Sequence, residues 1–134
     1  MNRVIKIALA GLVIFSLMAI PATAGSPHFV GACTFTQSGN TVTVSCKEAG
    51  LGDEAQINVE LSATALCINS GGKNPKAVNK AGVAADATVP VQNGQAKYTL
   101  SGTATFKPDC SPPMTVEFTD ITVTDTTNNL SQHF

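Results

Sequence analysis

Four cysteines are the feature that most constrains what this chain of 134 residues can fold into. In an oxidising compartment, two pairs of cysteines form disulfides more readily than they bind a metal as thiolates. Two such cross-links would staple a small domain whose hydrophobic core alone is modest. The candidate disulfide residues are Cys33, Cys46, Cys67 and Cys110.

The N-terminus indicates that the chain reaches an oxidising compartment. Arg3 and Lys6 give a positive start, residues 7–20 form an apolar run, and small residues occupy 22–24, as in a secretory signal peptide. The run is shorter than the roughly 20 residues that span a bilayer. We therefore predict a signal peptide over residues 1–24, a single secreted domain over residues 25–134, extracellular or periplasmic, and no membrane insertion after cleavage.

The charge of the mature chain argues against one class of partner. Six lysines, no arginine and nine acidic residues give residues 25–134 a formal charge of −3. Proteins that bind nucleic acids present basic, usually arginine-bearing surfaces to the phosphates. We expect no nucleic-acid partner.

The first cysteine pair follows from the register of a predicted hairpin. Gly39-Asn40 between two alternating runs is typical of a two-residue turn, which places Cys33 opposite Cys46. Counting outward from the turn, this pair falls at a non-hydrogen-bonded site, where strands approach most closely. We predict Cys33–Cys46 and, by elimination, Cys67–Cys110, although four cysteines allow three connectivities.

Further strands are indicated by residues that alternate between apolar and polar. Residues 57–67 alternate throughout, Asn93-Gly94 predicts a second hairpin between residues 87–91 and 96–100, and the second strand continues towards residue 106. Residues 114–124 change phase near Thr119-Asp120, which predicts a β-bulge. We expect one short turn at most over residues 50–55 and no helix.

Six or seven short strands with turns between them predict an all-β fold, an antiparallel β-sandwich of immunoglobulin-like type with two disulfides. A small barrel is the alternative. The mature chain carries 15 threonines, and the first hairpin places Thr34, Thr36, Thr43 and Ser45 on the face away from the cysteines. The solvent faces are therefore expected to be rich in hydroxyl groups.

The segment over residues 69–80 is the candidate binding loop. It combines lysines, asparagines and a Gly-Gly pair, and loops on a rigid scaffold often bind partners. A cationic, amide-rich patch there would suit an anionic or hydroxylated partner; the alternative is a crossover loop that needs glycine for its backbone and lysine for solubility. The candidate binding residues are Asn69, Lys73, Asn74, Lys76, Asn79 and Lys80.

Catalytic and metal-binding patterns are missing from the sequence. His28 and His133 lie near opposite ends of the mature chain, and Asp53-Glu54, Asp120 and Asp125 are expected to be solvated acids. There is no nucleophile motif, and no tryptophan for stacking on sugars. We expect no enzyme activity, no metal site and no cofactor.

Three segments resemble a family of small secreted β-rich proteins without an established activity. They are His-Phe-Val at 28–30, Lys-Glu-Ala-Gly-Leu-Gly at 47–52, and the Cys-x-Asn-x-Gly-Gly-x-Asn-Pro pattern at 67–75. The resemblance implies export and a single β-domain. It implies no catalytic or ligand-binding residues.

These observations favour a secreted, non-enzymatic protein that works by surface contact. Adhesion, association with the cell envelope or matrix, and ligand binding all fit, with an extracellular protein or a cell-surface component as the partner. The alternatives are an inhibitor of a secreted hydrolase and a subunit of an extracellular fibre.

The leader and the cysteines together make a prediction for the exported product. Its intact mass should correspond to a chain that starts at Gly25 and lacks four hydrogens, and it should not react with thiol reagents before reduction. A product that retains residues 1–24, or that carries four free thiols, would contradict this interpretation.

Overall fold

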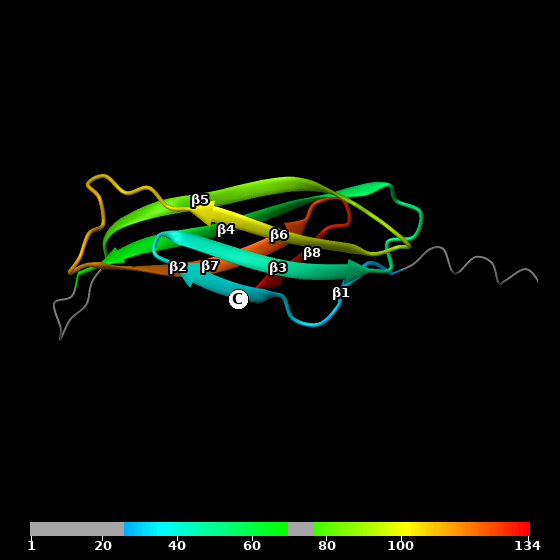
Figure 1. Ribbon diagram of the computed structural model, residues 1–134, viewed down its shortest axis with the longest axis horizontal. Coiled ribbons are helices and arrows are strands. Elements are labelled where there is room, and N and C mark those ends of the chain that lie inside the picture. The colour runs from blue at the N-terminus through cyan, green and yellow to red at the C-terminus, as the bar shows by residue number, and fades with distance from the viewer. Residues whose placement is uncertain (1–25, 70–76) are drawn as a thin grey trace, which may run out of the picture.

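A computed structural model describes residues 26–69 and 77–134 of the chain, with backbone only at 77 and 78. These residues form eight β-strands in two antiparallel sheets that lie face to face (Figure 1). The predicted all-β fold, an antiparallel β-sandwich with two disulfides, is confirmed, with one or two strands more than expected. The strands are β1 (His28–Phe29), β2 (Thr34–Ser38), β3 (Thr41–Ala49), β4 (Gln56–Ile68), β5 (Ala77–Pro90), β6 (Ala96–Thr103), β7 (Thr115–Asp125) and β8 (Leu130–His133).

The first sheet, here called sheet A, is organised around β3. β6 pairs with β3 from Thr41 to Glu48, so it occupies one edge of that strand. On the other edge, β2 pairs with the first half of β3 and β1 pairs with its last two residues. The second sheet, sheet B, has the order β5-β4-β7-β8. Because β3 is paired on both edges, its register fixes which side chains sheet A turns inward.

The predicted first hairpin is correct in its turn and its register. Phe35 lies opposite Val44 and Ser38 opposite Thr41. Cys33 and Cys46 form a disulfide with their Cα atoms 4.5 Å apart, as expected for a non-hydrogen-bonded pair. The other disulfide, Cys67–Cys110, is also as predicted.

The predicted second hairpin is wrong beyond its turn. Asn93 and Gly94 both have positive φ angles, and Gln92 and Gln95 form the bridge that closes the turn. After the turn the chain changes layers, so that β5 pairs with β4 in sheet B and β6 pairs with β3 in sheet A. Alternation in the two runs reports that each has a buried face, but it does not distinguish strands that pair from strands that pack across the core.

The predicted bulge in β7 is confirmed. The register between β4 and β7 shifts by one residue between Ser62 and Thr64, and Asp120 has a φ of 53°. An extra residue at this point turns the following side chains to the other face. Ile121 and Val123 are therefore buried in the core, which the phase change in the sequence had indicated.

The two sheets approach closely where β6 crosses β5. Gly102 of β6 is buried, and a Cβ added there would overlap Val83 Cγ1 on β5 and contact Leu61 Cδ2 on β4 at 3.8 Å. Valine is stiff about χ1, so it cannot easily make room. A residue without a side chain is therefore required for the two layers to close at this point.

This contact predicts opposite effects for two glycine substitutions. Gly102→Ala should lower the free energy of unfolding by about 1–3 kcal/mol, because it overpacks the core. Gly82→Ala, in β5 with open space around its Cα, should raise it by about 0.4–1 kcal/mol by restricting the unfolded chain. Urea denaturation measures both, and equal effects at the two sites would contradict the packing argument.

Candidate functional site

The predicted binding loop is shorter than the sequence indicated. Lys73, Asn74 and Lys76 lie outside the described residues. Asn79 and Lys80 are not in a loop, because β5 begins at Ala77 and pairs them with Cys67 and Leu66 of β4. The segment thus joins two neighbouring antiparallel strands, and the crossover interpretation of it is wrong.

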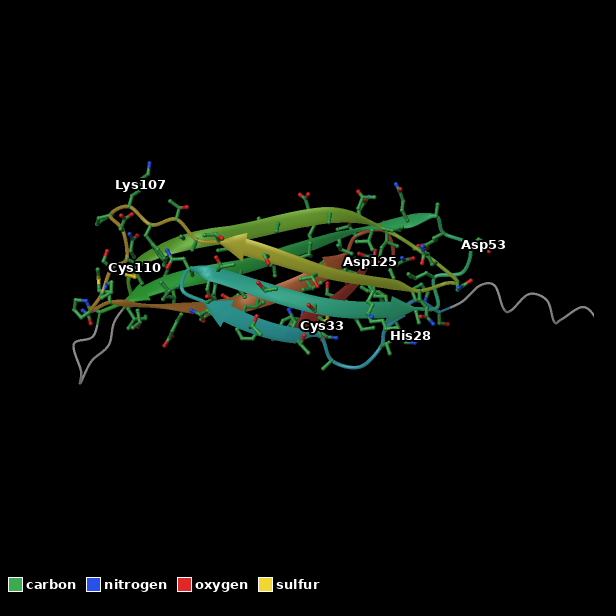
Figure 2. The ribbon with its side chains drawn as sticks, viewed as in Figure 1. His28, Cys33, Asp53, Lys107, Cys110 and Asp125 are labelled. Atoms are coloured by element: carbon green, nitrogen blue, oxygen red, sulfur yellow. A yellow bond between two sulfur atoms is a disulfide. The ribbon has the colours of Figure 1, made fainter. Side chains whose placement is uncertain are left out.

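The side chain of Asn79 has a structural role. Its Nδ2 donates a hydrogen bond to the Lys107 carbonyl oxygen at 3.2 Å, and its Oδ1 accepts one from the Lys80 backbone N–H at 3.0 Å. These bonds hold the chain after β6 against the start of β5. Asn69 lies half-buried directly after β4, and Lys80 is exposed. Figure 2 shows Lys107 and Cys110 at the end of the sandwich opposite His28 and Asp53.

The outer side of sheet A carries nine hydroxyl groups in three rows, which we call the hydroxyl face. Each of β2, β3 and β6 contributes three alternate residues, since every second side chain of a strand points to the same side. Hydroxyl pairs at 2.8 Å join the row along β3 to the row along β6 at three places: Thr41 with Thr103, Thr43 with Ser101, and Ser45 with Thr99. The remaining members are Thr34, Thr36 and Ser38 of β2.

Two lysines continue the hydroxyl face towards the end of β3. Lys47 and Lys97 lie directly opposite each other on β3 and β6, and both are exposed. None of the outward-facing strand residues of sheet A is acidic, and within the described part of the chain neither lysine has an ion-pair partner. Like charges directly opposite on neighbouring strands destabilise a sheet. The fold alone therefore gives no reason for this pair.

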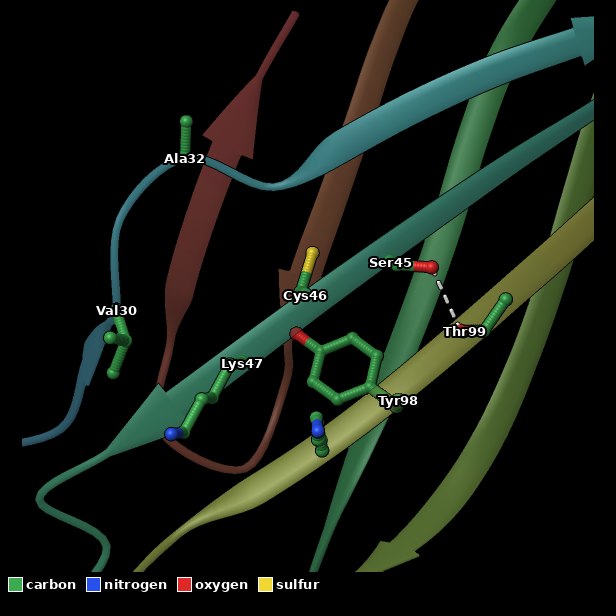
Figure 3. Close-up of a pocket in the computed structure, with 8 residues that line it drawn as sticks. Val30, Ala32, Ser45, Cys46, Lys47, Tyr98 and Thr99 are labelled. Carbon is green, nitrogen blue, oxygen red and sulfur yellow. Dashed lines mark hydrogen bonds between the residues drawn. The ribbon is translucent and has the colours of Figure 1, made fainter.

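Shallow depressions lie on both sides of the lysine pair. One, of about 540 Å³, is bounded by Val30 and Ala32 and reaches Ser45 and Thr99 (Figure 3). The other, of about 450 Å³, is bounded by the side chains of the turn between β5 and β6, among them Gln92, Asn93 and Gln95. The lysines thus stand between hydroxyl groups on one side and amide groups on the other.

The Cys33–Cys46 disulfide holds the rim of the first depression. It ties the chain just after Ala32 to β3 between Ser45 and Lys47. The Val30 backbone N–H donates to the Lys47 carbonyl oxygen at 2.8 Å, and the Cys33 N–H donates to Oε1 of Gln132 at 2.6 Å. The rim is thereby attached to both sheets.

A cluster of acids is buried beneath this end of sheet A. Glu48 and Asp125 are both 0% exposed, so the expectation that Asp125 is solvated is wrong. The Tyr98 hydroxyl donates to Glu48 Oε2 at 2.5 Å, while Glu48 Oε1 has no hydrogen-bond partner. Asn128 donates from Nδ2 to Asp125 Oδ2 at 2.8 Å and to Glu54 Oε1 at 3.0 Å. Asp125 Oδ1 also accepts the backbone N–H groups of residues 127 and 128.

The environment of the cluster favours one neutral carboxyl group. Burial, together with the neighbouring Asp125, raises the pKa of Glu48 from 4.5 to about 7, against the hydrogen bond from Tyr98, which lowers it. Burial and the bond to Glu48 also raise the pKa of Tyr98. Two carboxyl groups are thus brought together, which the sequence did not indicate, but they have no access to a substrate. Glu48 is separated by an even number of residues from Val42, Val44 and Cys46 on β3. Because alternate residues of a strand point to the same side, this spacing could have predicted that Glu48 points inward.

Metal binding finds no support in the described residues, which contain no group of three or more histidine, cysteine or acidic side chains arranged to hold an ion. His28 and His133 lie on different sheets, and each has a hydrogen bond, to the Ser26 carbonyl and the Thr122 hydroxyl respectively. Over the same described ranges, no helix is long and apolar enough to cross a membrane.

No family model, curated protein or solved structure matches this chain. The resemblance of the three sequence segments to a secreted family therefore stays an expectation.

The raised pKa of Glu48 predicts that the protein is more stable in acid. The folded state binds the Glu48 proton more tightly than the unfolded state does. This difference adds to the free energy of unfolding in full below about pH 4.5, and the addition is lost as the pH rises to about 7. The loss amounts to about 3 kcal/mol. Glu48→Gln should remove this part of the pH dependence, as measured by urea denaturation between these pH values.

The exposed Glu117 of β7 provides the control, because it lies opposite Leu66 and not opposite another acid. Glu117→Gln should leave the difference in stability between the two pH values as it is in the unchanged protein, since this side chain is exposed to solvent. A Glu48→Gln protein with the same pH dependence as the Glu117→Gln protein would show that Glu48 is not the group responsible.

Proposed function

We propose that this protein is a secreted, non-enzymatic binding domain that attaches by its hydroxyl face to a hydroxyl-rich polymer at the cell surface or in the extracellular matrix. The observation that carries the proposal is the regular array of nine serine and threonine side chains on sheet A. Strands lie about 4.8 Å apart and alternate residues about 7 Å apart, so the array repeats in two directions. A repeating surface of donors and acceptors suits a repeating partner.

The paired hydroxyls are suited to binding because they are both positioned and still available. Each hydroxyl has one donor hydrogen and two acceptor lone pairs. A bond between two hydroxyls, such as Thr43 and Ser101, uses one donor and one acceptor and leaves the rest for a partner. The bond also restricts both side chains, which lowers the entropy cost of binding.

The shape of the face favours an extended partner. Small molecules are usually bound in concave, largely apolar sites that bury most of their surface. The hydroxyl face is the outer side of a sheet, and the depressions described above lie at its lysine end. It therefore suits a polymer or a surface lying along the strands.

Sheet B is a weaker candidate for the same role. Its outer side carries Glu60 and Asp86 directly opposite each other on β4 and β5, together with Glu117 of β7. These acids interrupt the hydroxyl pattern and would repel an anionic partner. The two disulfides are consistent with an oxidising environment, as export would require.

A matched pair of variants tests the proposal. Thr43→Val with Ser101→Ala removes the central hydroxyl pair of sheet A, and Thr124→Val with Ser131→Ala removes a comparable cross-strand pair, at 3.1 Å, from sheet B. The first double variant should lose about tenfold or more in affinity for polysaccharide, and the second should lose little.

The measurement is retention of the purified mature chain on gels of immobilised dextran and of alginate, with thermal melting to confirm the fold. If neither gel retains the unchanged protein, or if both double variants bind alike, the hydroxyl face is not a polysaccharide-binding surface.

A further inference from the structure

We propose that the polymer bound by the hydroxyl face is an acidic polysaccharide, whose anionic groups are bound by Lys47 and Lys97. This inference rests on the function proposed above and specifies the class of its ligand. It follows from the place of the two lysines in the hydroxyl rows, from their charge, and from the groups that surround them.

The lysines extend the hydroxyl rows without a break. Lys47 is the next outward-facing residue after Ser45 on β3, and Lys97 is the one before Thr99 on β6. From Thr41 to Lys47 the outward residues of β3 span about 20 Å. A chain of several sugar units lying along β3 would therefore meet hydroxyl groups first and ammonium groups at one end.

An anion between the lysines would remove an unfavourable contact. The two lysines lie directly opposite each other on neighbouring strands, and none of the outward-facing strand residues described for sheet A is acidic. A carboxylate or sulfate group placed between them would be attracted to both and would relieve their mutual repulsion. The adjoining depressions offer the hydroxyls of Ser45 and Thr99 and the amides of Gln92 and Asn93 as further partners.

The composition of the face separates a polysaccharide from other polyanions. Two cations accompany nine hydroxyl groups, a ratio that suits a polymer with many hydroxyls and few charges. Nucleic acids carry a charge on every phosphate, and proteins that bind them use arginine and aromatic side chains; the outward-facing strand residues of sheet A include no arginine, phenylalanine, tyrosine or tryptophan. An anionic membrane is usually bound by clusters of several basic residues.

Binding to immobilised alginate, compared with the neutral polymer dextran, tests the inference. The unchanged protein should bind alginate at least about tenfold more tightly than dextran at low salt, and the preference should shrink at high salt, because exposed charges are screened. Lys47→Gln with Lys97→Gln should abolish the preference, while Lys47→Arg with Lys97→Arg should keep it.

Lys80 and Lys107 supply the matched control. Both are exposed, and both lie towards the other end of the sandwich from Lys47. Lys80→Gln with Lys107→Gln changes the net charge by the same amount and should leave the preference for alginate intact. If this variant loses as much affinity as the Lys47 and Lys97 variant, the anion is bound elsewhere and the inference is wrong.

A second readout does not depend on binding. Without polysaccharide, Lys97→Gln should melt at a temperature equal to or above that of the unchanged protein, because a repulsion is removed. Alginate should raise the melting temperature of the unchanged protein more than that of the variant. A variant that melts at a clearly lower temperature would show that Lys97 stabilises the fold and would overturn the argument from repulsion.

The remaining outcomes separate the inference from the proposed function. Equal binding to alginate and dextran that still depends on Thr43 and Ser101 would overturn the acidic ligand and leave the hydroxyl face as a binding surface. Binding to duplex DNA or to phosphatidylglycerol vesicles as tightly as to alginate would overturn it as well, because charge alone would then explain the affinity.

Discussion

The register of β3 is the constraint on which the rest of this structure depends. The strand is paired along both edges, and its side chains alternate between the core and the solvent. Val42, Val44, Cys46 and Glu48 point inward, and Thr41, Thr43, Ser45 and Lys47 point outward. A shift of one residue would exchange the two sets, burying a lysine and exposing the core. The Cys33–Cys46 disulfide can form only in the native register, so it reinforces the pairing covalently.

Because the alternation is strict, the interior and the surface of this end of the molecule are coupled. Glu48 follows Lys47 directly, and Tyr98 follows Lys97, so the buried acid and its phenol partner lie under the two exposed ammonium groups. The same two strands thus build both features. A change that moves β6 along β3 would disturb the lysine pair and the bond between Tyr98 and Glu48 together.

Much of the fold could be predicted from local sequence signals. The Gly39-Asn40 turn gave the register of the first hairpin and hence the first disulfide, and the phase change near Asp120 gave the bulge. These features depend on residues close together in the chain. The change of layer after Asn93-Gly94 could not be predicted in the same way, since a tight turn is compatible both with a hairpin and with strands in different sheets. The start of β5 was missed because Asn79 and Lys80 are polar, although they pair with Cys67 and Leu66.

The candidate site was predicted only in part. The hydroxyl-rich outer surface was expected from the threonines of the first hairpin, but the third row comes from β6, whose pairs with β3 join residues 48 to 62 positions apart in the sequence. The same long-range pairing brings Lys47 to Lys97. Asp125 and Glu48 were missed as partners for a related reason, because they belong to different sheets and meet only across the core.

The buried carboxyl group of Glu48 makes the stability of the fold depend on the pH of the solution around the protein. A gel of fixed negative charges accumulates counterions, protons among them, so the solution inside it is more acidic than the medium around it. A domain in which a buried carboxyl group is protonated in the folded state would have a higher free energy of unfolding within such a gel than outside it. The stability of the fold would then depend on the local pH, separately from any stabilisation that comes from binding the polymer.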